Sequence, residues 1–269
     1  MATRASVIVR AKNERRSIER ALTALRAQTV EPEIIVVDSG STDGTREIAA
    51  RYCDRLIDIP SERFTFGYAL NVGARAAQAP IHFALSAHCV PHRRDWIERA
   101  LAHYARPDVA GTQGDETLPD GTPLEGTFIE DAAFARAHPG WGFSNHASSW
   151  RASVWERFPF DERLEAAEDK EWALRVLDAG WVIAVDPALW VDLSHGWRNG
   201  LVRSYRRQKL NSRVVSEFAS LPPYTARDLV REWWSEPSDR RRSPWRFRLN
   251  HRRAAVLLGK WAGSRAAHR

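Results

Sequence analysis

The sequence predicts an α/β protein in which a mostly parallel, Rossmann-like sheet is flanked by helices. Within the first hundred residues a short apolar strand segment recurs four times, with a helical pattern between consecutive strands. This alternation is typical of a parallel sheet wound by right-handed crossovers. Polar clusters follow three of the strands, and no apolar run reaches the roughly 18 residues of a membrane span.

The predicted strands are short β-branched or apolar runs, at 6–9, 33–37, 56–59 and 81–85. Helices are expected between them wherever apolar residues recur at helical spacing, at about 18–25, 45–52 and 68–77. Asn13 is expected to cap the first helix, because its side chain can accept hydrogen bonds from free backbone N–H groups. Ligands on such sheets bind at the carboxyl ends of the strands, so the polar segments there are candidates for a site.

The second half of the chain has a looser pattern. Residues 111–142 are rich in Gly, Pro, Thr and acidic residues, as loops around a binding site often are. Helices are expected at 168–179 and 201–219, and two prolines end the second one. We therefore expect a main domain over residues 1–220 and a basic, Trp- and Arg-rich helical appendage over residues 221–269.

Composition narrows the class of protein. Mean hydropathy is −0.46, and no charged-then-apolar leader precedes the first strand, so a cytoplasmic location is expected. Cys53 and Cys89 are the only cysteines, which indicates neither a disulfide framework nor a zinc site. The net charge of +6 has two readings, an anionic partner or simple solubility.

Three features indicate a nucleotide diphosphate site. Asp38 ends a strand where a Ser/Gly/Thr loop begins, Ser86-Ala87-His88 ends another, and Glu168-Asp169 opens a helix whose dipole favours acidic residues. Each feature has an ordinary explanation: a turn for Asp38, a solvent-facing side chain for His88, and a first-turn charge pair for Glu168 and Asp169. Their order along the chain favours the functional interpretation.

That order resembles family 2 of the inverting glycosyltransferases, which have the GT-A fold. The similarity runs from about residue 4 to 210. The segments that carry it are Ser6–Glu14, the Asp38-Ser39-Gly40-Ser41-Thr42-Asp43-Gly44-Thr45 stretch, Ala69–Gly73, Ala84–Pro91, Phe160–Glu162 and Glu168–Trp172. The resemblance implies sugar transfer, with inversion, from a nucleotide-diphosphate sugar to an acceptor hydroxyl, in bacterial surface glycan or polysaccharide synthesis.

The resemblance also implies roles for individual residues. Asp169 would be the catalytic base, because an acceptor hydroxyl must lose its proton as it attacks the anomeric carbon, and Glu168 would orient it or contact the acceptor. Trp141 and Asn145 would contact the acceptor, since aromatic rings stack on the apolar faces of sugars. The donor would be held by Arg10, Lys12, Asn13, Glu14, Asp38, Ser39, Asn71, Ser86, Ala87 and His88.

The chain departs from the family at the metal motif, where Ser86-Ala87-His88 replaces Asp-x-Asp. A divalent cation, Mn2+ or Mg2+, is expected to neutralise the diphosphate, with His88 and the later His195 as candidate ligands. Two roles stay open for His88: metal ligand, or direct hydrogen-bond donor to phosphate. His195 is equally compatible with a surface histidine near a turn.

The remaining predictions concern partners. The acceptor would be a glycan or a lipid-linked sugar, and the cationic, Trp-containing tail would either rest on the anionic inner face of the plasma membrane or pack on the domain. No nucleic-acid partner is expected. Two alternatives are a nucleotidyltransferase on a similar sheet and a catalytically impaired GT-A-like protein that binds a nucleotide or a membrane.

Overall fold

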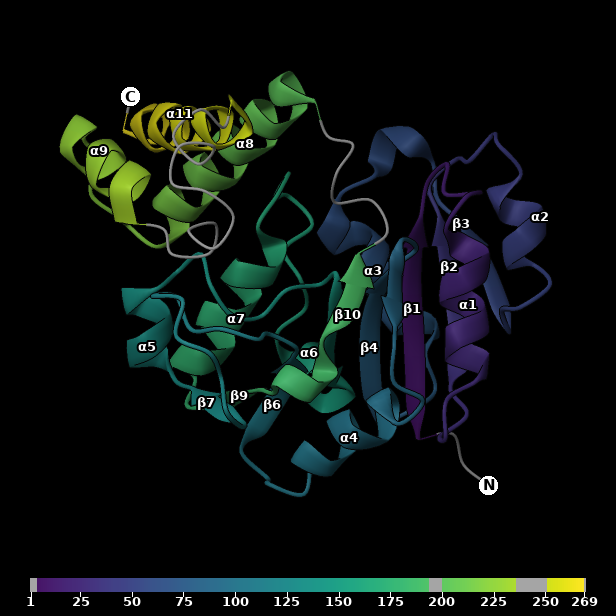
Figure 1. Ribbon diagram of the computed structural model, residues 1–269. Coiled ribbons are helices and arrows are strands. Elements are labelled where there is room, and N and C mark those ends of the chain that lie inside the picture. Colours follow the sequence, from purple (N-terminus) through teal and green to yellow (C-terminus); the bar gives the residue numbers. More distant parts are fainter. Residues whose placement is uncertain (1–3, 194–199, 236–250, 269) are drawn as a thin grey trace.

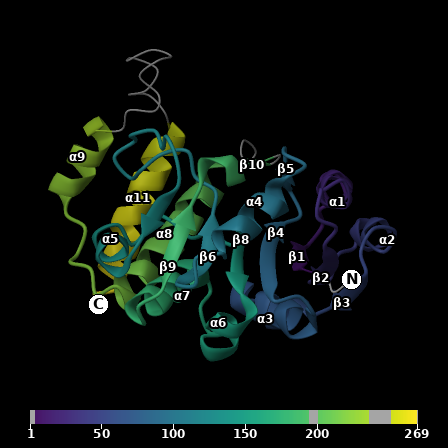
Figure 2. The same ribbon diagram turned by 90° about the horizontal axis from the view of Figure 1, so that it is seen from below.

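The computed structural model of the chain describes residues 4–193, 200–235 and 251–268, and an eight-stranded mixed sheet lies at the centre of these residues (Figure 1). The strand order is β3-β2-β1-β4-β8-β6-β9-β7. Helices cover both faces of the sheet, and more helices follow at the C-terminal end of the chain (Figures 1 and 2). The predicted fold class, a mostly parallel α/β sheet with a helical C-terminal end, is confirmed.

The first four strands are parallel, and they lie where the sequence predicts them. β1 pairs with β2 on one side and with β4 on the other, and β3 extends the sheet beyond β2. Their carboxyl ends therefore meet at one edge, towards the top of Figure 1. The bounds are β1 Ala5–Ala11, β2 Glu33–Asp38, β3 Arg55–Asp58 and β4 Ile81–Ser86.

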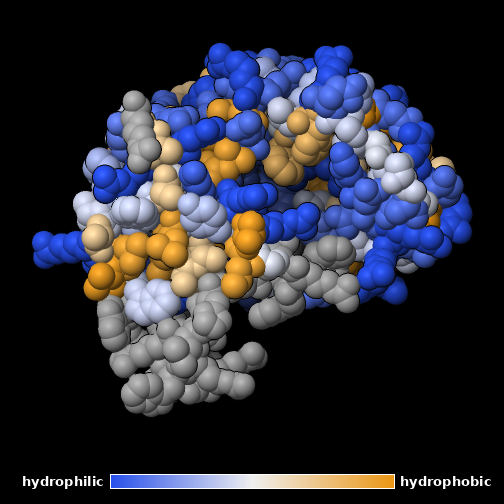
Figure 3. Space-filling model, turned by 90° about the horizontal axis from the view of Figure 1, so that it is seen from above, coloured by the Kyte–Doolittle hydropathy of each residue, from blue (hydrophilic) through white to orange (hydrophobic). Residues whose placement is uncertain are grey.

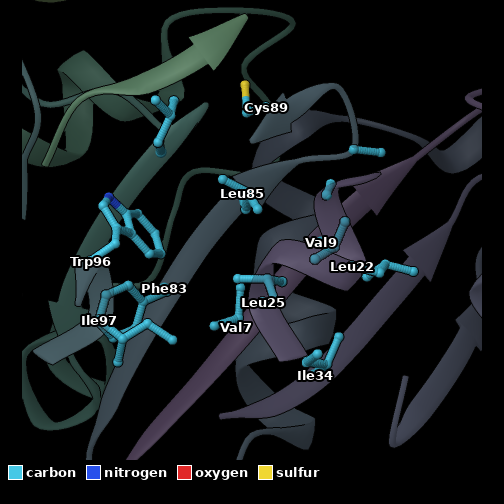
Figure 4. Close-up of a cluster of buried hydrophobic side chains, with 14 of the residues drawn as sticks. Val7, Val9, Leu22, Leu25, Ile34, Phe83, Leu85, Cys89, Trp96 and Ile97 are labelled. Atoms are coloured by element: carbon cyan, nitrogen blue, oxygen red, sulfur yellow. The ribbon is translucent and has the colours of Figure 1, made fainter. Parts of the chain in front are cut away.

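The core lies on both faces of these strands because their side chains alternate. Val7 and Val9 on β1 face α1 and α4, whereas Ile8 between them faces α3. Figure 4 shows the first cluster, in which Trp96 of α4 packs against Phe83 of β4. The bounds of the helices are α1 Ile18–Arg26, α2 Thr45–Ala49, α3 Phe66–Ala76 and α4 Trp96–His103.

One predicted cap is wrong. Ser17, not Asn13, occupies the position before α1, and it makes no side-chain capping hydrogen bond. Asn13 has a left-handed backbone, with φ of 54°, and its side-chain oxygen accepts a hydrogen bond from the Thr42 backbone at 2.9 Å. The asparagine therefore links the loops after β1 and β2 and does not start a helix.

The second half of the sheet is mixed. β8 is antiparallel to β4 and β6, and β9 is parallel to β6. The segment from residue 111 to 142, expected to be loop, also contains β7 and α5; the two elements bury Glu130 and Ala135. The bounds are β5 Cys89–Pro91, β6 Val109–Gln113, β7 Phe128–Glu130, α5 Ala132–Ala137, β8 Ala147–Arg151, α6 Ala152–Arg157, α7 Glu168–Asp178, β9 Val182–Val185 and β10 Val191–Leu193.

The C-terminal helices are α8 (Leu201–Phe218), α9 (Ala226–Ser235) and α11 (His251–Ala266), and α11 packs along α8 (Figure 1). Gly259 and Gly263 allow this close approach: a Cβ on Gly263 would lie 2.1 Å from the Lys209 carbonyl oxygen. The predicted division at residue 220 stays a prediction; α8 before it packs directly on α11 after it.

Candidate active site

A cleft of about 650 Å³ opens at the carboxyl edge of the parallel strands. Figure 3 views the molecule from this end, where the surface is hollowed. The sheet contributes the ends of β1 and β4, α7 contributes its first turn, and the C-terminal helices form the opposite wall. The predicted site residues on the wall of this cleft are Arg10, Ser86, His88, Asn145, Glu168 and Asp169.

The Glu168-Asp169 pair is presented by the start of α7. Ala167, which precedes the helix, has a left-handed backbone with φ of 56°, and the helix then runs without interruption to Asp178. The Asp169 carboxylate accepts hydrogen bonds from the Lys170 backbone at 2.8 Å and from the Asn145 backbone at 3.2 Å. These two contacts hold the Asp169 carboxylate in one orientation, and Asp169 lines the cleft.

Glu168 differs from Asp169 because it is buried, with 4% of its surface exposed. Burial and the adjacent Asp169 raise its pKa to about 7, and the Arg10 guanidinium opposes this shift. Arg10 Nη1 lies 3.6 Å from the Glu168 carboxylate, and Asn145 donates to the same carboxylate at 3.3 Å. Glu168 is thus placed to orient Asn145 and Arg10 around Asp169.

Arg10 connects the sheet with the rest of the cleft. Its Nη2 donates to the Asn145 carbonyl oxygen at 2.5 Å and to Ser86 Oγ at 3.4 Å, and its guanidinium lies 5.2 Å from the centroid of the Phe66 ring. Burial lowers the pKa of Arg10, although the group stays charged because an arginine pKa starts far above neutrality. This buried cation partly neutralises the acidic pair on α7.

The segment that replaces the metal motif reaches the same cleft. Ser86 and His88 line it, whereas Ala87 is buried at the end of β4. His88 Nδ1 lies 3.0 Å from Glu14 Oε1, so the end of β4 is tied to the loop after β1. Among the described residues, no three His, Cys, Asp or Glu side chains cluster so that they could hold a metal ion. His195, the other predicted ligand, lies outside the described residues.

The predicted donor residues after β1 and β2 form a connected network beside the cleft. Asp38 is fully buried, and its carboxylate accepts from the Gly40 and Ser41 backbones at 3.0 and 2.8 Å, and from Ser41 Oγ. These are the contacts that a turn requires. Ser39 bonds back to the Ala11 carbonyl oxygen, and the exposed Lys12 donates to Ser61 at 3.2 Å. None of these side chains lies on the wall of the cleft.

Two other predicted residues lie in packed surroundings. The Asn71 side chain is buried, donating to the Phe160 carbonyl oxygen at 2.8 Å and accepting from Trp155 Nε1 at 2.8 Å, so it links α3 to the segment before α7. Trp141 packs edge-on against Phe134, and its ring N–H donates to the Thr117 carbonyl oxygen. The structure therefore places both side chains away from the cleft wall.

Among the cleft residues that were not predicted from the sequence are His146 and Lys170, which lie next to the acidic pair in the chain or in the cleft. Burial lowers the pKa of His146 to about 4, so its imidazole is neutral near pH 7, and Nδ1 lies 2.7 Å from Ser144 Oγ. Lys170 donates from Nζ to the carbonyl oxygens of Gly142 and Phe143 at 2.8 and 2.7 Å. The sequence did contain a signal for both residues, because each directly follows a predicted site residue, Asn145 or Asp169.

The opposite wall of the cleft comes from the C-terminal helices. Arg213 of α8 donates to Glu165 at 2.9 Å and so attaches this wall to the segment before α7. The wall mixes cationic, amide and aromatic side chains, which suits a polar ligand. Its members include Arg207, Gln208, Asn211, Tyr224 and Lys260.

The chain is similar in sequence to known glycosyltransferases. Residues 6–128 match the model of the family described as Glycosyl transferase family 2. The chain is 30% identical over 193 residues to Glycosyltransferase AglE of Haloferax volcanii, covering 65% of this chain and 62% of that protein. It is 29% identical over 195 residues to the O-antigen chain rhamnosyltransferase WbaN of Salmonella anatum, covering 65% and 60%. The chain thus spans about three fifths of the length of these curated relatives.

The fold also has relatives among solved structures. The mannosyltransferase PcManGT from Pyrobaculum calidifontis, in complex with GDP-Man and Mn2+, superposes with a TM-score of 0.63 at 21% identity, covering 99% of this chain and 74% of that one. At this identity the likeness shows the fold alone. Residues 6–128 thus carry the sequence match to glycosyltransferase family 2, and the chain has the GT-A fold of its solved relatives.

Proposed function

We propose that the chain transfers a sugar, with inversion, from a nucleotide-diphosphate donor to a hydroxyl of a glycan or lipid-linked acceptor during surface glycan synthesis. The observation that carries the proposal is the oriented carboxylate of Asp169 in a cleft that the ends of β1 and β4 also line. The rhamnosyltransferase relative and the GDP-Man complex of the structural relative support this class of reaction.

Asp169 is the general base of the proposed step. Its carboxylate takes the proton from the acceptor hydroxyl while that oxygen forms a bond to the anomeric carbon. The bond from the anomeric carbon to the diphosphate breaks on the opposite side, and the nucleoside diphosphate leaves with the electron pair. Attack opposite the leaving group inverts the anomeric centre. Asn145 and Glu168 orient the base, and Arg207 across the cleft is placed to neutralise negative charge on the leaving group.

In this proposal the donor and the acceptor contact different parts of the cleft. The nucleotide lies along the ends of β1 and β4 with its diphosphate towards Arg207 of α8, and the acceptor lies against Asn145 and the rest of the wall that α8 and α11 form. A divalent cation, which the Mn2+ complex of the structural relative supports, would meet the diphosphate at His88. We assign no step to it, because the described residues do not form a complete set of ligands.

Nucleotide binding is the first test of the proposal. At 100 times its dissociation constant a ligand stabilises a protein by about 2.7 kcal/mol, so GDP or UDP is expected to raise the melting temperature by roughly 5–10 °C. His88→Ala is expected to weaken binding about tenfold and to halve this shift. Thermal unfolding with and without Mn2+ measures both effects. If His88 binds phosphate directly, His88→Ala is expected to reduce the thermal shift equally with and without Mn2+. If His88 is a metal ligand, the substitution is expected to reduce the shift only when Mn2+ is present.

The control for this test is His103→Ala, which removes a histidine that pairs with Asp186 at 2.8 Å, away from the cleft. This variant is expected to have an altered melting temperature but a normal nucleotide-induced shift. No shift with any nucleoside diphosphate in the wild-type chain would contradict the proposed donor class.

The C-terminal helices also support peripheral contact with an anionic membrane. Residues 200–269 hold 17 of the 40 Lys and Arg residues but only 5 of the 34 Asp and Glu residues, so the rest of the chain has an acidic excess. Large apolar side chains are exposed on the same helices, and Figure 3 shows apolar surface on that side of the molecule. They are Leu201, Val202, Val230 and Leu258. Cations with exposed apolar groups favour anionic lipid surfaces.

Within the part of the chain that the structure describes, no helix combines the length and apolarity that crossing a bilayer requires. The predicted peripheral contact is therefore tested on the surface residues. The double substitution Val202→Asp and Val230→Asp is expected to reduce sedimentation with phosphatidylserine vesicles at least tenfold, and added salt is expected to weaken wild-type binding. The control is Thr23→Asp, on the exposed side of α1. Equal sedimentation of wild type and double variant would refute this surface.

A further inference from the structure

Glu130 is a buried carboxyl group that the proposed reaction does not use. It ends β7, 1% of its surface is exposed, and its Oε2 has no hydrogen-bond partner among the described residues. Buried polar groups usually have partners, so this carboxyl calls for an explanation. It could be a tolerated defect of the core, or it could support a neighbouring part of the molecule.

The part of the molecule directly above Glu130 is the loop of residues 142–145. Gly142 has a left-handed backbone with φ of 75°, and a Cβ there would lie 2.3 Å from Glu130 Oε2 and 2.5 Å from Oε1. Burial raises the pKa of Glu130, and the Phe143 backbone N–H, which also lies near the carboxyl group, favours the charged form and so opposes this rise. Only glycine allows both the backbone conformation and the close approach, so the loop rests directly on Glu130.

Lys170 holds the same loop from the side of α7. Its Nζ donates to the carbonyl oxygens of Gly142 and Phe143, and it lies beside Glu130 at a small cavity of about 10 Å³. Lys170 follows Asp169 in the helix, so the contact joins the loop to the turn that carries the base.

The other end of the loop reaches the base itself. The Ser144 backbone donates to Gln113 Oε1 at 3.0 Å, and the Asn145 backbone donates to Asp169 Oδ2 at 3.2 Å. The loop is therefore fixed by Glu130 and Lys170 at one end and aims a backbone N–H at Asp169 from the other.

We propose that Glu130 is a positioning residue, whose buried carboxyl supports the 142–145 loop and, through Asn145, sets the orientation of the Asp169 carboxylate. The inference rests on the proposed function for its meaning, because it assigns Glu130 a part in aligning the base. Its first test, however, requires no substrate and concerns only the loop.

Hydrogen exchange of the full-length chain, followed by mass spectrometry, measures how firmly the loop is held. In Glu130→Ala the amides of residues 143–145 are expected to exchange about tenfold faster than in the wild type, because local opening becomes easier. Glu130→Gln keeps the shape and one acceptor oxygen, and its amide resembles a protonated carboxyl group, so it is expected to restore most of the protection. Unchanged exchange in the loop of Glu130→Ala would overturn the proposal.

The matched control is Glu33→Gln, which alters another buried carboxyl at the start of β2, bonded to Ser6 and to the Gln78 backbone. It is expected to leave exchange in the 142–145 loop as in the wild type. If Glu130→Ala instead accelerates exchange throughout the sheet, with no excess in the loop, Glu130 is only a core residue and the proposal fails.

Glu130→Gln provides an independent readout if the alanine variant does not fold. Burial raises the pKa of Glu130 to about 7, and Lys170, Asp131 and His138 are the charged or titratable groups around it. Above that pH the charged carboxylate attracts the Lys170 ammonium away from the loop carbonyls. Loop protection, compared with nearby strands, is expected to fall more between pH 6 and pH 8 in the wild type than in Glu130→Gln, because Glu168 titrates in both proteins and Glu130 only in the wild type. The same fall in both proteins would overturn the proposal.

The link to catalysis is tested by steady-state kinetics. A displaced base is expected to lower kcat of Glu130→Ala about tenfold or more, with KM for the donor nearly unchanged and Glu130→Gln close to wild type. A rise in KM at constant kcat would contradict the positioning role. An inactive wild type would count against the proposed function alone, because the exchange result stands without it.

Discussion

Replacing Asp169 by Asn is expected to lower the rate of sugar transfer by about 10²–10⁴-fold, because an amide cannot take the proton of the acceptor hydroxyl. Asn has nearly the same size as Asp, and its single side-chain oxygen can keep one of the two backbone contacts, which Asp169 makes to Asn145 through Oδ2 and to Lys170 through Oδ1. The fold and the nucleotide subsite are expected to be little affected. The measurements are initial rates with a nucleotide-sugar donor and the nucleotide-induced thermal shift.

Glu171→Gln is the matched control, since Glu171 lies in the same first turn of α7 but pairs with Arg175 at 2.8 Å. This variant is expected to retain wild-type rates. If Asp169→Asn transfers sugar at a normal rate, Asp169 is not the base. Loss of the thermal shift together with the rate would indicate instead that Asp169 contributes to donor binding.

Removing the positive charge of Arg10 is expected to have the largest effect on stability. In Arg10→Met the guanidinium that faces Glu168 is lost, and the Asn145 carbonyl oxygen and Ser86 Oγ lose a donor. Breaking a buried ion pair typically costs about 3–5 kcal/mol, because the remaining charge is left without a partner. Unfolding by urea measures the change, and Arg10→Lys is expected to recover part of it.

This destabilisation is expected to depend on pH. The folded-state pKa of Glu168 already lies above its ordinary value, and loss of Arg10 raises it further. A group whose folded pKa is raised binds its proton more tightly in the folded state, so stability falls as pH rises from the unfolded pKa towards the folded pKa. Arg10→Met is therefore expected to lose more stability at pH 8 than at pH 5.

Arg51→Met is the control for the loss of a charged pair, because Arg51 pairs with Glu19 at 3.3 Å on the surface. Exposed pairs contribute about 0–1 kcal/mol, so a small and nearly pH-independent change is expected. A comparable loss in both variants, or a loss in Arg10→Met that does not vary with pH, would contradict the assigned coupling between Arg10 and Glu168.

The local pattern of the sequence was sufficient for the first half of the sheet. Runs such as Val7-Ile8-Val9 alternate between two apolar faces, and this alternation depends only on neighbouring residues. The start of α7 was also predicted at Glu168, where acidic residues suit a helix N-terminus. Parallel strands bring their carboxyl ends to one edge, so the position of the cleft followed from the same pattern.

Individual side chains in the site were harder to place. Asp38 has the turn contacts that were the alternative to donor binding, Asn71 links two elements from a buried position, and Trp141 packs against other rings. The residue type alone does not indicate whether a polar or aromatic side chain faces a ligand or another side chain. Its direction depends on residues that lie far away along the chain.

The sequence by itself determined the class of the fold, the order of the polar clusters along the strands, and the resemblance to glycosyltransferase family 2 with its candidate base. Only the tertiary structure decided that Arg10 lies against Glu168, that the C-terminal helices form the second wall of the cleft, and that Glu130 lies beneath the loop that contacts Asp169. The physical reason is the sequence separation over which interactions act. Periodicity and helix capping depend on residues that are only a few positions apart. The charges and hydrogen bonds of this cleft instead join segments separated by tens to more than a hundred residues, and only packing brings those segments together.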